Sequence, residues 1–288
     1  TALISTTDFF MPIVDDPFQF GMIAAANAIS DVYAMGGKPV LALAILGLPV
    51  SKLPAEVAQQ IISGGRNICR QADIPLAGGH SIDSTEPIFG LAVSGLIDIN
   101  NIKKNNTAQA GDLLFLTKPI GTGIITSAAK KQMVKDEDLK MAIETMCSLN
   151  KIGGELGKIK GVNALTDVTG FGLLGHLAEM CEGSNLSAEI YFENIPLITN
   201  LDYYLDKFIY PDMTTKIYAV YSDKVNELTA RQLFIICDPQ TSGGLLVSVS
   251  PEAIEEFKRL TEKFELANIC SKPIGKMKPK EEKLILVI

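Results

Sequence analysis

Residues 17–48 carry the pattern that decides the fold, PFQFGMIAAANAISDVYAMGGKPVLALAILGL. The pair Asp16–Pro17 predicts a helix start, with Asp16 as the N-cap and the proline at the first helical position. Gly36–Gly37 ends this helix at about Met35, and the apolar run Val40–Leu48 predicts a buried strand. Because the centre of the helix is built from small residues, we expect it to pack very close to a sheet.

The same alternation continues on both sides of this stretch. The predicted elements are strands at 1–7, 88–97, 112–117, 162–165, 233–237 and 245–249, and helices at 53–73, 123–131, 136–158 and 173–180. Alternating strands and helices favour a layered α/β (α+β) architecture. The polar segment Asn100–Asn106 is the best linker candidate, so we expect two domains, 1–104 and 105–288. Residues 196–230 look irregular, and no sequence of helices and strands is predicted for them.

Composition excludes several classes of protein. Of the 288 residues, 47% are hydrophobic and the net charge is −7, so a buried core is expected and a nucleic-acid platform is not. The longest apolar stretch, Val40–Val50, is far shorter than the roughly 20 residues that a membrane-spanning helix needs. Five widely spaced cysteines form no CxxC pair, which is typical of reduced thiols in a cytoplasmic protein.

Three aspartates lie at the ends of predicted elements. Asp8 follows the first strand, Asp31 lies one helical turn after Asn27, and Asp167 ends the strand that begins at Val162. Carboxylate oxygens suit Mg²⁺, which in turn binds phosphate oxygens. Each aspartate could instead be a turn, cap or ordinary surface residue. The sequence contains no GxxxxGK[ST] phosphate loop, so a nucleotide would have to be held in another way.

Glycine-rich segments offer backbone N–H groups to a phosphate. Gly78–Ser81 and Thr169–Gly172 are both predicted to be loops of this kind, and the second leads directly into a helix. A plain turn is an equal alternative for each. A third glycine-bearing loop, Gln240–Gly244, fits a tight connection better than a site. His176 lies among leucines on a predicted helix and is interpreted as structural.

Five stretches together resemble the selenophosphate synthetase family. They are STTDFF (5–10), AAANAISDVYAMGG (24–37), LAGGHSID (76–83), TDVTGFGLLGH (166–176) and DPQTSGG (238–244). The resemblance spans nearly the whole chain. TDVTGFGLLGH by itself is fairly specific to a wider superfamily of ATP-binding proteins, and the full set in this order is specific to the selenophosphate enzyme.

This resemblance implies two domains of the aminoimidazole ribonucleotide synthetase type, with the N-terminal domains paired in a homodimer. It implies that ATP, selenide and water are converted to selenophosphate, AMP and phosphate. Asp8 would contact the nucleotide, Asp31 would bind both Mg²⁺ and the nucleotide, and Asp167 would bind Mg²⁺. Gly79, His80 and Ser81 would reach the ATP of the partner subunit.

The sequence departs from the family pattern at its start. The family carries a reactive cysteine or selenocysteine, a lysine and a further metal-binding aspartate before the first strand, and all of these would lie upstream of Thr1. The resemblance therefore places no catalytic residue within this chain. Because Thr1 already lies inside a predicted strand, we expect upstream residues to be missing and this fragment to be inactive or impaired.

Two alternatives to the selenophosphate enzyme stay open. The first is another ATP enzyme of the same superfamily, such as aminoimidazole ribonucleotide synthetase or thiamine-phosphate kinase. The second is a non-catalytic relative that binds nucleotide and acts through partners. The identity of the product separates the first alternative from the selenium enzyme, because only the latter makes AMP and selenophosphate from selenide.

Overall fold

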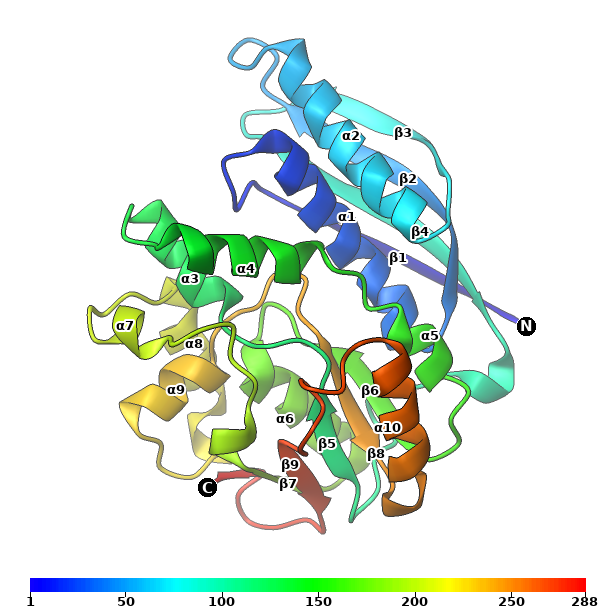
Figure 1. Ribbon diagram of the computed structural model, residues 1–288, viewed down its shortest axis with the longest axis vertical. Helices are drawn as coiled ribbons and strands as arrows, with labels where there is room; N and C mark the ends of the chain where they lie inside the picture. Colours follow the sequence, from blue (N-terminus) through cyan, green and yellow to red (C-terminus); the bar gives the residue numbers. More distant parts are fainter.

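The computed structural model describes residues 1–288 and contains two sheets, each with helices of its own (Figure 1). The first sheet has the order β1-β4-β2-β3, in which β2 and β3 are parallel and the other neighbours are antiparallel. Its elements are β1 (Ala2–Phe10), α1 (Pro17–Ala34), β2 (Lys38–Leu48), α2 (Ala55–Gln71), β3 (Leu76–Asp83) and β4 (Ile88–Ile97). The expected layered α/β architecture is confirmed.

The predicted first strand, 1–7, is observed with slightly different bounds. Thr1 is exposed and precedes β1 instead of belonging to it, because the pairing with β4 begins at Ala2. The pairing then continues as far as Phe10, which faces Phe89. Asp8 therefore lies within β1 and not after it.

Helix α1 forms as the sequence predicts and packs closely on its neighbours. The Asp16 side chain accepts a hydrogen bond from the Gln19 N–H at 2.7 Å, and Pro17 begins the helix. A Cβ atom on Gly21 would lie 2.0 Å from the backbone oxygen of Ile61 in α2, and one on Gly64 would lie 2.0 Å from that of Phe18. Glycines at the crossing therefore let the two helix backbones touch.

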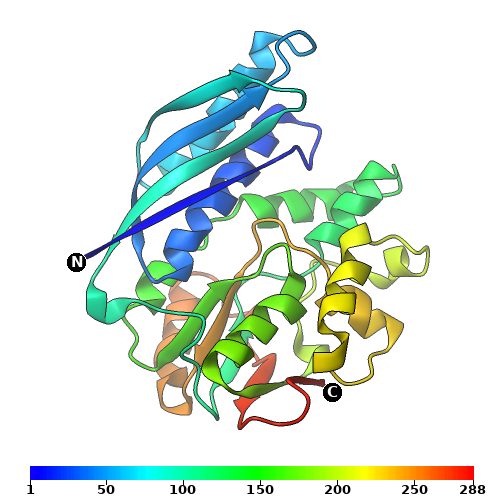
Figure 2. The same ribbon diagram turned by 180° about the vertical axis from the view of Figure 1, so that it is seen from behind.

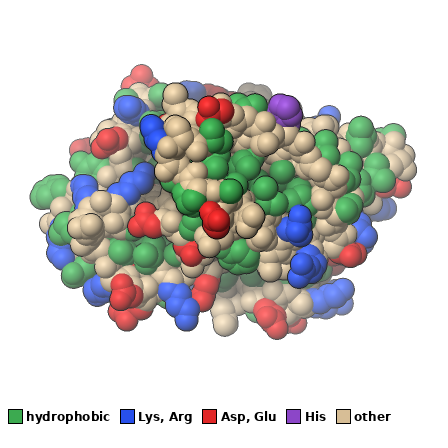
Figure 3. All heavy atoms as spheres, turned by 90° about the horizontal axis from the view of Figure 1, so that it is seen from above, with side chains coloured by type: hydrophobic (Ala, Val, Ile, Leu, Met, Phe, Trp, Pro, Cys, Tyr) green, Lys and Arg blue, Asp and Glu red, His purple; other side chains and the backbone are tan.

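One face of the first sheet is left bare. Helices α1 and α2 cover the opposite face, where Ile4, Phe89, Leu91 and Val93 are buried. Figure 2 shows the bare face with no helix in front of it. Large apolar side chains from four strands are exposed in this half: Leu3, Phe9, Val40, Leu43, Ile82 and Leu96. We call this set the bare sheet face. Figure 3 shows the end of the molecule that is at the top of Figure 1, where hydrophobic side chains also reach the surface among polar and charged ones.

The second sheet has the order β10-β7-β9-β5-β8-β6 and is covered on both faces. Its strands are β5 (Leu113–Leu116), β6 (Val162–Asp167), β7 (Ser187–Ile190), β8 (Leu245–Val249), β9 (Gly275–Lys278) and β10 (Ile285–Val287). The helices are α3 (Thr122–Lys130), α4 (Asp136–Cys147), α5 (Ile152–Leu156), α6 (Gly172–Ser184), α7 (Asp202–Leu205), α8 (Asp212–Tyr221), α9 (Ala230–Ile236) and α10 (Ile254–Lys263). Short 3-10 turns occur at 99–101, 192–194, 222–224 and 251–253. No helix in the structure has the length and apolar character needed to cross a bilayer.

Two predicted elements are wrong in type. Gly78–Ser81 is not a loop but part of β3, an exposed edge strand. The absence of a side chain at Gly79 allows the pairing, because a Cβ there would lie 2.1 Å from the backbone oxygen of Ala44 in β2. Residues 233–237 were predicted as a strand, but most of them belong to helix α9.

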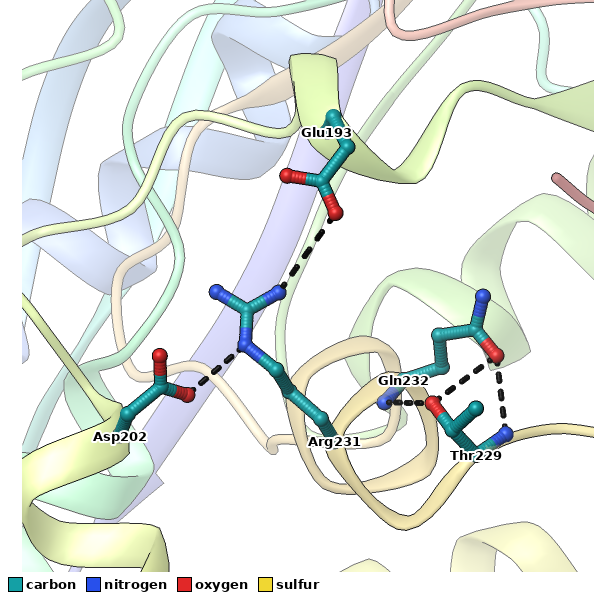
Figure 4. A network of polar contacts seen from close by, with 5 residues as sticks. All are labelled: Glu193, Asp202, Thr229, Arg231 and Gln232. Atoms are coloured by element: carbon teal, nitrogen blue, oxygen red, sulfur yellow. Dashed lines mark hydrogen bonds and ion pairs between the residues drawn. The ribbon is translucent and has the colours of Figure 1, made fainter.

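The start of α9 explains that second error. Thr229 and Gln232 form a reciprocal capping box, which fixes the first helical turn. Arg231 then donates to Asp202 at 2.8 Å and lies 3.9 Å from Glu193 (Figure 4). The contact with Asp202 ties α9 to the segment 196–230, which contains α7 and α8 and for which the sequence predicted no secondary structure.

The predicted long helix 136–158 is also wrong, because it is broken into α4 and α5. Ser148 ends α4 with an extended backbone. The carbonyl of Ser148 accepts a hydrogen bond from the buried ammonium of Lys118 at 2.7 Å. Helix α5 then turns toward α1, where a Cβ on Gly153 would lie 2.3 Å from the backbone oxygen of Tyr33. A straight helix could not make this close approach.

Candidate active site

The three predicted aspartates converge on one side of helix α1. Thr6 in β1 donates from its hydroxyl to Asp31 Oδ2 at 2.5 Å. The Asn27 amide donates to Asp8 Oδ2. The Ser30 hydroxyl donates to Asp167 Oδ2 at 2.7 Å. The site therefore combines β1 and α1 of the first half with the end of β6 from the second half.

Helix α1 is the hub of this arrangement because of its spacing. Ser30 and Asp31 follow Asn27 by three and four positions, so each lies next to Asn27 on the helix surface. Around them, the helix is built from alanines that are almost wholly buried. This combination lets three polar side chains reach the seam between the two halves without a bulky neighbour in the way.

Asp31 and Asp167 line a groove of about 420 Å³ between the halves, whereas Asp8 is not among its lining residues. We call it the aspartate groove; its lining residues are Ile4, Ser5, Thr6, Asp31, Ala34, Met35, Lys103, Lys104, Asn105, Asn106, Leu165, Thr166 and Asp167. The expected linker, Asn100–Asn106, thus contributes one wall of the groove. Lys103 is largely fixed there, because its ammonium donates to the backbone oxygen of Ile159 at 2.8 Å.

Negative charge is crowded in this part of the molecule. Burial raises the pKa of Asp167 to about 6, and repulsion from Asp31 and Asp8 adds to the effect. The hydrogen bond from Ser30 acts in the opposite direction. Burial, followed by repulsion from Asp31, also raises the pKa of Asp8. A cation placed among these groups would relieve the repulsion and favour their ionised forms.

The donor set fits Mg²⁺ held jointly with a ligand. No group of three or more His, Cys, Asp or Glu side chains forms a ready metal cage. Mg²⁺ commonly uses one or two carboxylates and takes its remaining ligands from water and substrate phosphates. Asp31 and Asp167 can supply such a pair. The residues therefore suit a metal that arrives with a phosphate-bearing ligand.

Gly79, His80 and Ser81 are not brought together with the aspartates of the same chain. They lie in β3, at one edge of the first sheet, whereas Asp8 lies in β1 at the other edge. The three residues line a separate groove of about 270 Å³. Any contact between this strand and a site on an aspartate groove would have to involve a second copy of the chain.

The second predicted glycine loop, Thr169–Gly172, does follow Asp167 and leads into α6. The backbone N–H of Thr169 donates to His176 Nε2 at 3.0 Å. Burial lowers the pKa of His176 to about 4, so the ring is neutral near pH 7 and can accept this bond. His176 supports the loop from behind, in line with its interpretation as a structural residue.

The loop Asp238–Gly244 holds the N-terminus of α3. Gln240 Oε1 accepts from the backbone N–H groups of Gly121 and Thr122 at 3.1 and 3.2 Å. Asp238 Oδ2 accepts from the Gly123 N–H at 3.1 Å, and burial raises the pKa of Asp238 to about 8. These contacts agree with the prediction of a tight connection.

Sequence reasoning missed four polar residues next to the site: Ser30, Lys118, Asn150 and Ser242. Their side chains or backbone groups lie in one hydrogen-bond network behind the aspartates. One signal was available, because Lys118 directly follows the strand residues LLFLT in an otherwise apolar segment. The contacts of the other three depend on chain segments far apart in sequence.

The cysteines contribute no reactive group to the groove. All five are free thiols, and burial raises the pKa of each to about 11 or 12. A thiol attacks as the thiolate, so these pKa values make the five side chains poor nucleophiles near neutral pH. Thr1 does not line the aspartate groove either. That the reactive residue of the family lies upstream of Thr1 stays a prediction.

Comparisons with known proteins agree with this architecture. Residues 1–97 match the model of the AIR synthase related protein, N-terminal domain, and residues 109–287 match its C-terminal counterpart. A selenide, water dikinase of Shewanella sp. (strain MR-4) is 58% identical over 268 residues, which are 93% of this chain and 76% of that protein. The chain belongs to the selenide, water dikinase family. A second member, from Sulfurovum sp. (strain NBC37-1), is 51% identical over all of this chain and 83% of its own length.

Solved structures with lower identity share the fold of this selenide, water dikinase family member. A thiamine-monophosphate kinase from Stenotrophomonas maltophilia K279a has a TM-score of 0.76 at 16% identity, over 99% of this chain and 85% of that chain. The hydrogenase maturation protein HypE in complex with ATP has a TM-score of 0.75 at 15% identity, over 100% and 82%. At these identities the likeness concerns the fold alone.

Proposed function

We propose that the protein is a phosphotransferase that converts ATP, selenide and water into selenophosphate, AMP and phosphate. The observation that carries this proposal is the 58% identity to a selenide, water dikinase across 93% of the chain. The aspartate groove supports it, because carboxylates from both halves meet where a metal-bound polyphosphate would fit. Two domains, 1–104 and 105–288, and a cytoplasmic location with reduced thiols are part of the same proposal.

The proposed reaction breaks both phosphoanhydride bonds of ATP. Selenium attacks the γ-phosphorus of ATP, and the bond from that phosphorus to the bridging oxygen breaks, which leaves ADP. Water then attacks the β-phosphorus, so that AMP and phosphate are released. The two steps together balance the proposed reaction, with protons returned to solvent.

The residues of this chain act mainly by binding and orientation. Asp8 contacts the nucleotide, Asp31 binds Mg²⁺ and the nucleotide, and Asp167 binds Mg²⁺ from the second half. When bound, Mg²⁺ supplies neutralisation of the charge on the phosphate oxygens. Hydrogen bonds from Thr6 and Ser30 hold two of the carboxylates in fixed directions, which lowers the reorganisation needed during the reaction.

We propose a homodimer that forms through the bare sheet face. Exposed apolar side chains on four strands of one sheet are typical of a protein interface, and a symmetric pair is the commonest solution. Pairing there would also bring Gly79, His80 and Ser81 toward a second subunit, which would let these residues reach the ATP bound by the partner.

The dimer proposal predicts a change in mass for one substitution. Leu43→Asp places a charge on β2 of the bare sheet face, where the leucine is 42% exposed. We expect light scattering to show about twice the chain mass for the unmodified protein and about one chain mass for the variant. Phe208→Asp, at a residue that is 74% exposed in the second half, is the matched control and should stay dimeric. A dimeric Leu43→Asp variant would contradict the proposed interface.

Two alternatives predict different products. Another ATP enzyme of this fold, such as a thiamine-phosphate kinase, would release ADP, and a non-catalytic relative would bind nucleotide and release neither product. We expect chromatography to detect AMP only when selenide and Mg²⁺ are both present. ADP as the final product, or ATP left intact despite tight binding, would overturn the proposed function.

A further inference from the structure

Lys118 is a buried lysine close enough to Asp167 to feel its charge. Lys118 is 6% exposed, and its ammonium donates hydrogen bonds to the backbone oxygens of Ser148 and Ser242 at 2.7 Å each. Burial lowers the pKa of this lysine to about 7, against the opposing influence of Asp167. Burying an ammonium costs free energy unless it is well bonded, so this position calls for an explanation.

The first of its two contacts leads to Asp8. The ammonium holds the carbonyl of Ser242, and the backbone N–H of the same residue donates to Asn27 Oδ1 at 2.9 Å. Asn27 in turn donates from its amide nitrogen to Asp8. The hydrogen bond from Lys118 therefore holds Ser242 in place. Ser242 in turn orients the Asn27 amide, which donates to Asp8.

The second contact leads to Asp167. The ammonium holds the carbonyl of Ser148, two residues before Asn150. The Asn150 amide nitrogen donates to Ser30 Oγ and to the backbone oxygen of Gly243, at 2.9 Å each. Ser30 then donates to Asp167 Oδ2 at 2.7 Å. Both routes pass through helix α1; one ends on Asp8 in β1 and the other on Asp167, which lines the groove.

The loop held by Lys118 has a conformation that needs support. Ser242 has a φ of +49°, which is a left-handed conformation that non-glycine residues seldom adopt. A Cβ on Gly244 would lie 2.3 Å from the backbone nitrogen of Lys118. The loop therefore passes close to the backbone of Lys118, and the side chain of the same lysine donates a hydrogen bond to the carbonyl of Ser242 in that loop.

We propose that Lys118 is a positioning residue for phosphoryl transfer. It clamps the loop 238–244 to the connection between α4 and α5, and so sets Asp167 of the second half against Asp8 and Asp31 of the first. This role rests on the proposed function of the aspartate groove. It assigns no contact between Lys118 and the substrate.

The test compares Lys118→Met and Ser30→Ala, singly and together, with the wild type in the full-length protein. Loss of the clamp should lower kcat by roughly 10- to 100-fold, because about 1 Å of misplacement can cost that much. The Mg²⁺ concentration for half-maximal rate should rise in both single variants. Since the two changes cut one network, the decrease in log kcat of the double variant should be smaller than the sum of the decreases in the two single variants.

Ser187→Ala is the matched control, because this serine is also buried and bonded but lies in β7, at the far side of the second sheet. It should keep the wild-type Mg²⁺ requirement. A Lys118→Met protein that is folded at the assay temperature, with unchanged kcat and Mg²⁺ requirement, would overturn the proposal. If that variant does not fold, an unchanged Mg²⁺ requirement in Ser30→Ala would overturn it instead.

Calorimetric binding of a Mg²⁺-bound, non-hydrolysable ATP analogue separates this inference from the proposed function. A wild-type protein that makes no selenophosphate would contradict the proposed function. Weaker Mg²⁺-dependent binding in the two variants would still support the positioning role, and wild-type binding in both would contradict it.

Discussion

Replacing Asp167 by Asn is expected to lower kcat for ATP consumption by about 10³-fold or more, because metal binding to a transferred phosphoryl group contributes several kcal/mol. The amide keeps the shape of the side chain and can still accept the hydrogen bond from Ser30. The fold should stay intact, since the change removes a buried charge whose pKa is already raised to about 6. Wild-type ATP consumption by this variant would show that Asp167 holds no catalytic metal.

Asp112→Asn is the matched control for this experiment. Asp112 is as deeply buried, at 2% exposure, and lies beside β5 in the same half. It accepts hydrogen bonds from Gln109, Asn163 and Ser248, but it does not line the aspartate groove. We expect the opposite result, with stability lowered and kcat near the wild-type value at temperatures where the variant is folded.

Gly64→Ala is expected to destabilise the protein by about 3 kcal/mol, at the upper end of the cost of overpacking. The new methyl group would lie 2.0 Å from the backbone oxygen of Phe18, so α1 and α2 would have to move apart. Without that clash, the same change inside a helix would stabilise by about 1 kcal/mol. Urea denaturation therefore distinguishes the two cases by sign.

Ser63→Ala provides the comparison for the glycine variant, because Ser63 occupies the neighbouring helical position and is exposed. We expect little change in its unfolding free energy. Since α1 carries Asn27, Ser30 and Asp31, a folded Gly64→Ala protein should also bind ATP more weakly. Equal or greater stability of Gly64→Ala would contradict the close packing of the two helices.

The core of the fold could be predicted because local signals agreed with tertiary packing. Asp16–Pro17 and Gly36–Gly37 mark the ends of α1, and the apolar run that follows forms β2. The prediction that Asp8, Asp31 and Asp167 act together was based on their positions at the ends of predicted helices and strands. The structure places them around one helix, and their roles stay proposals.

The errors arose where local signals were ambiguous. Residues 233–237 form an apolar run too short for periodicity to separate a strand from a helix, and the Thr229 capping box decides in favour of the helix. The glycines of β3 suggested a loop, although their small size is what permits the strand to pair with β2.

The network around Lys118 could not be predicted from the sequence. Lys118 contacts residues 148 and 242 of the second half, and Ser242 contacts Asn27 of α1, so the network joins four chain segments that are far apart in the sequence. Neither spacing nor composition encodes such pairs, because no local element places them together. The sequence therefore identified carboxylates of the candidate site but not the residues that hold them.

Phosphorus NMR of the full-length protein with ATP, Mg²⁺ and selenide, under reducing and oxygen-free conditions, decides whether the protein makes selenophosphate. We expect a signal from a phosphorus bonded to selenium that rises together with AMP and phosphate, and that is lost with Asp167→Asn. A spectrum in which ATP is consumed to ADP, or stays unchanged while ATP is bound, would contradict it.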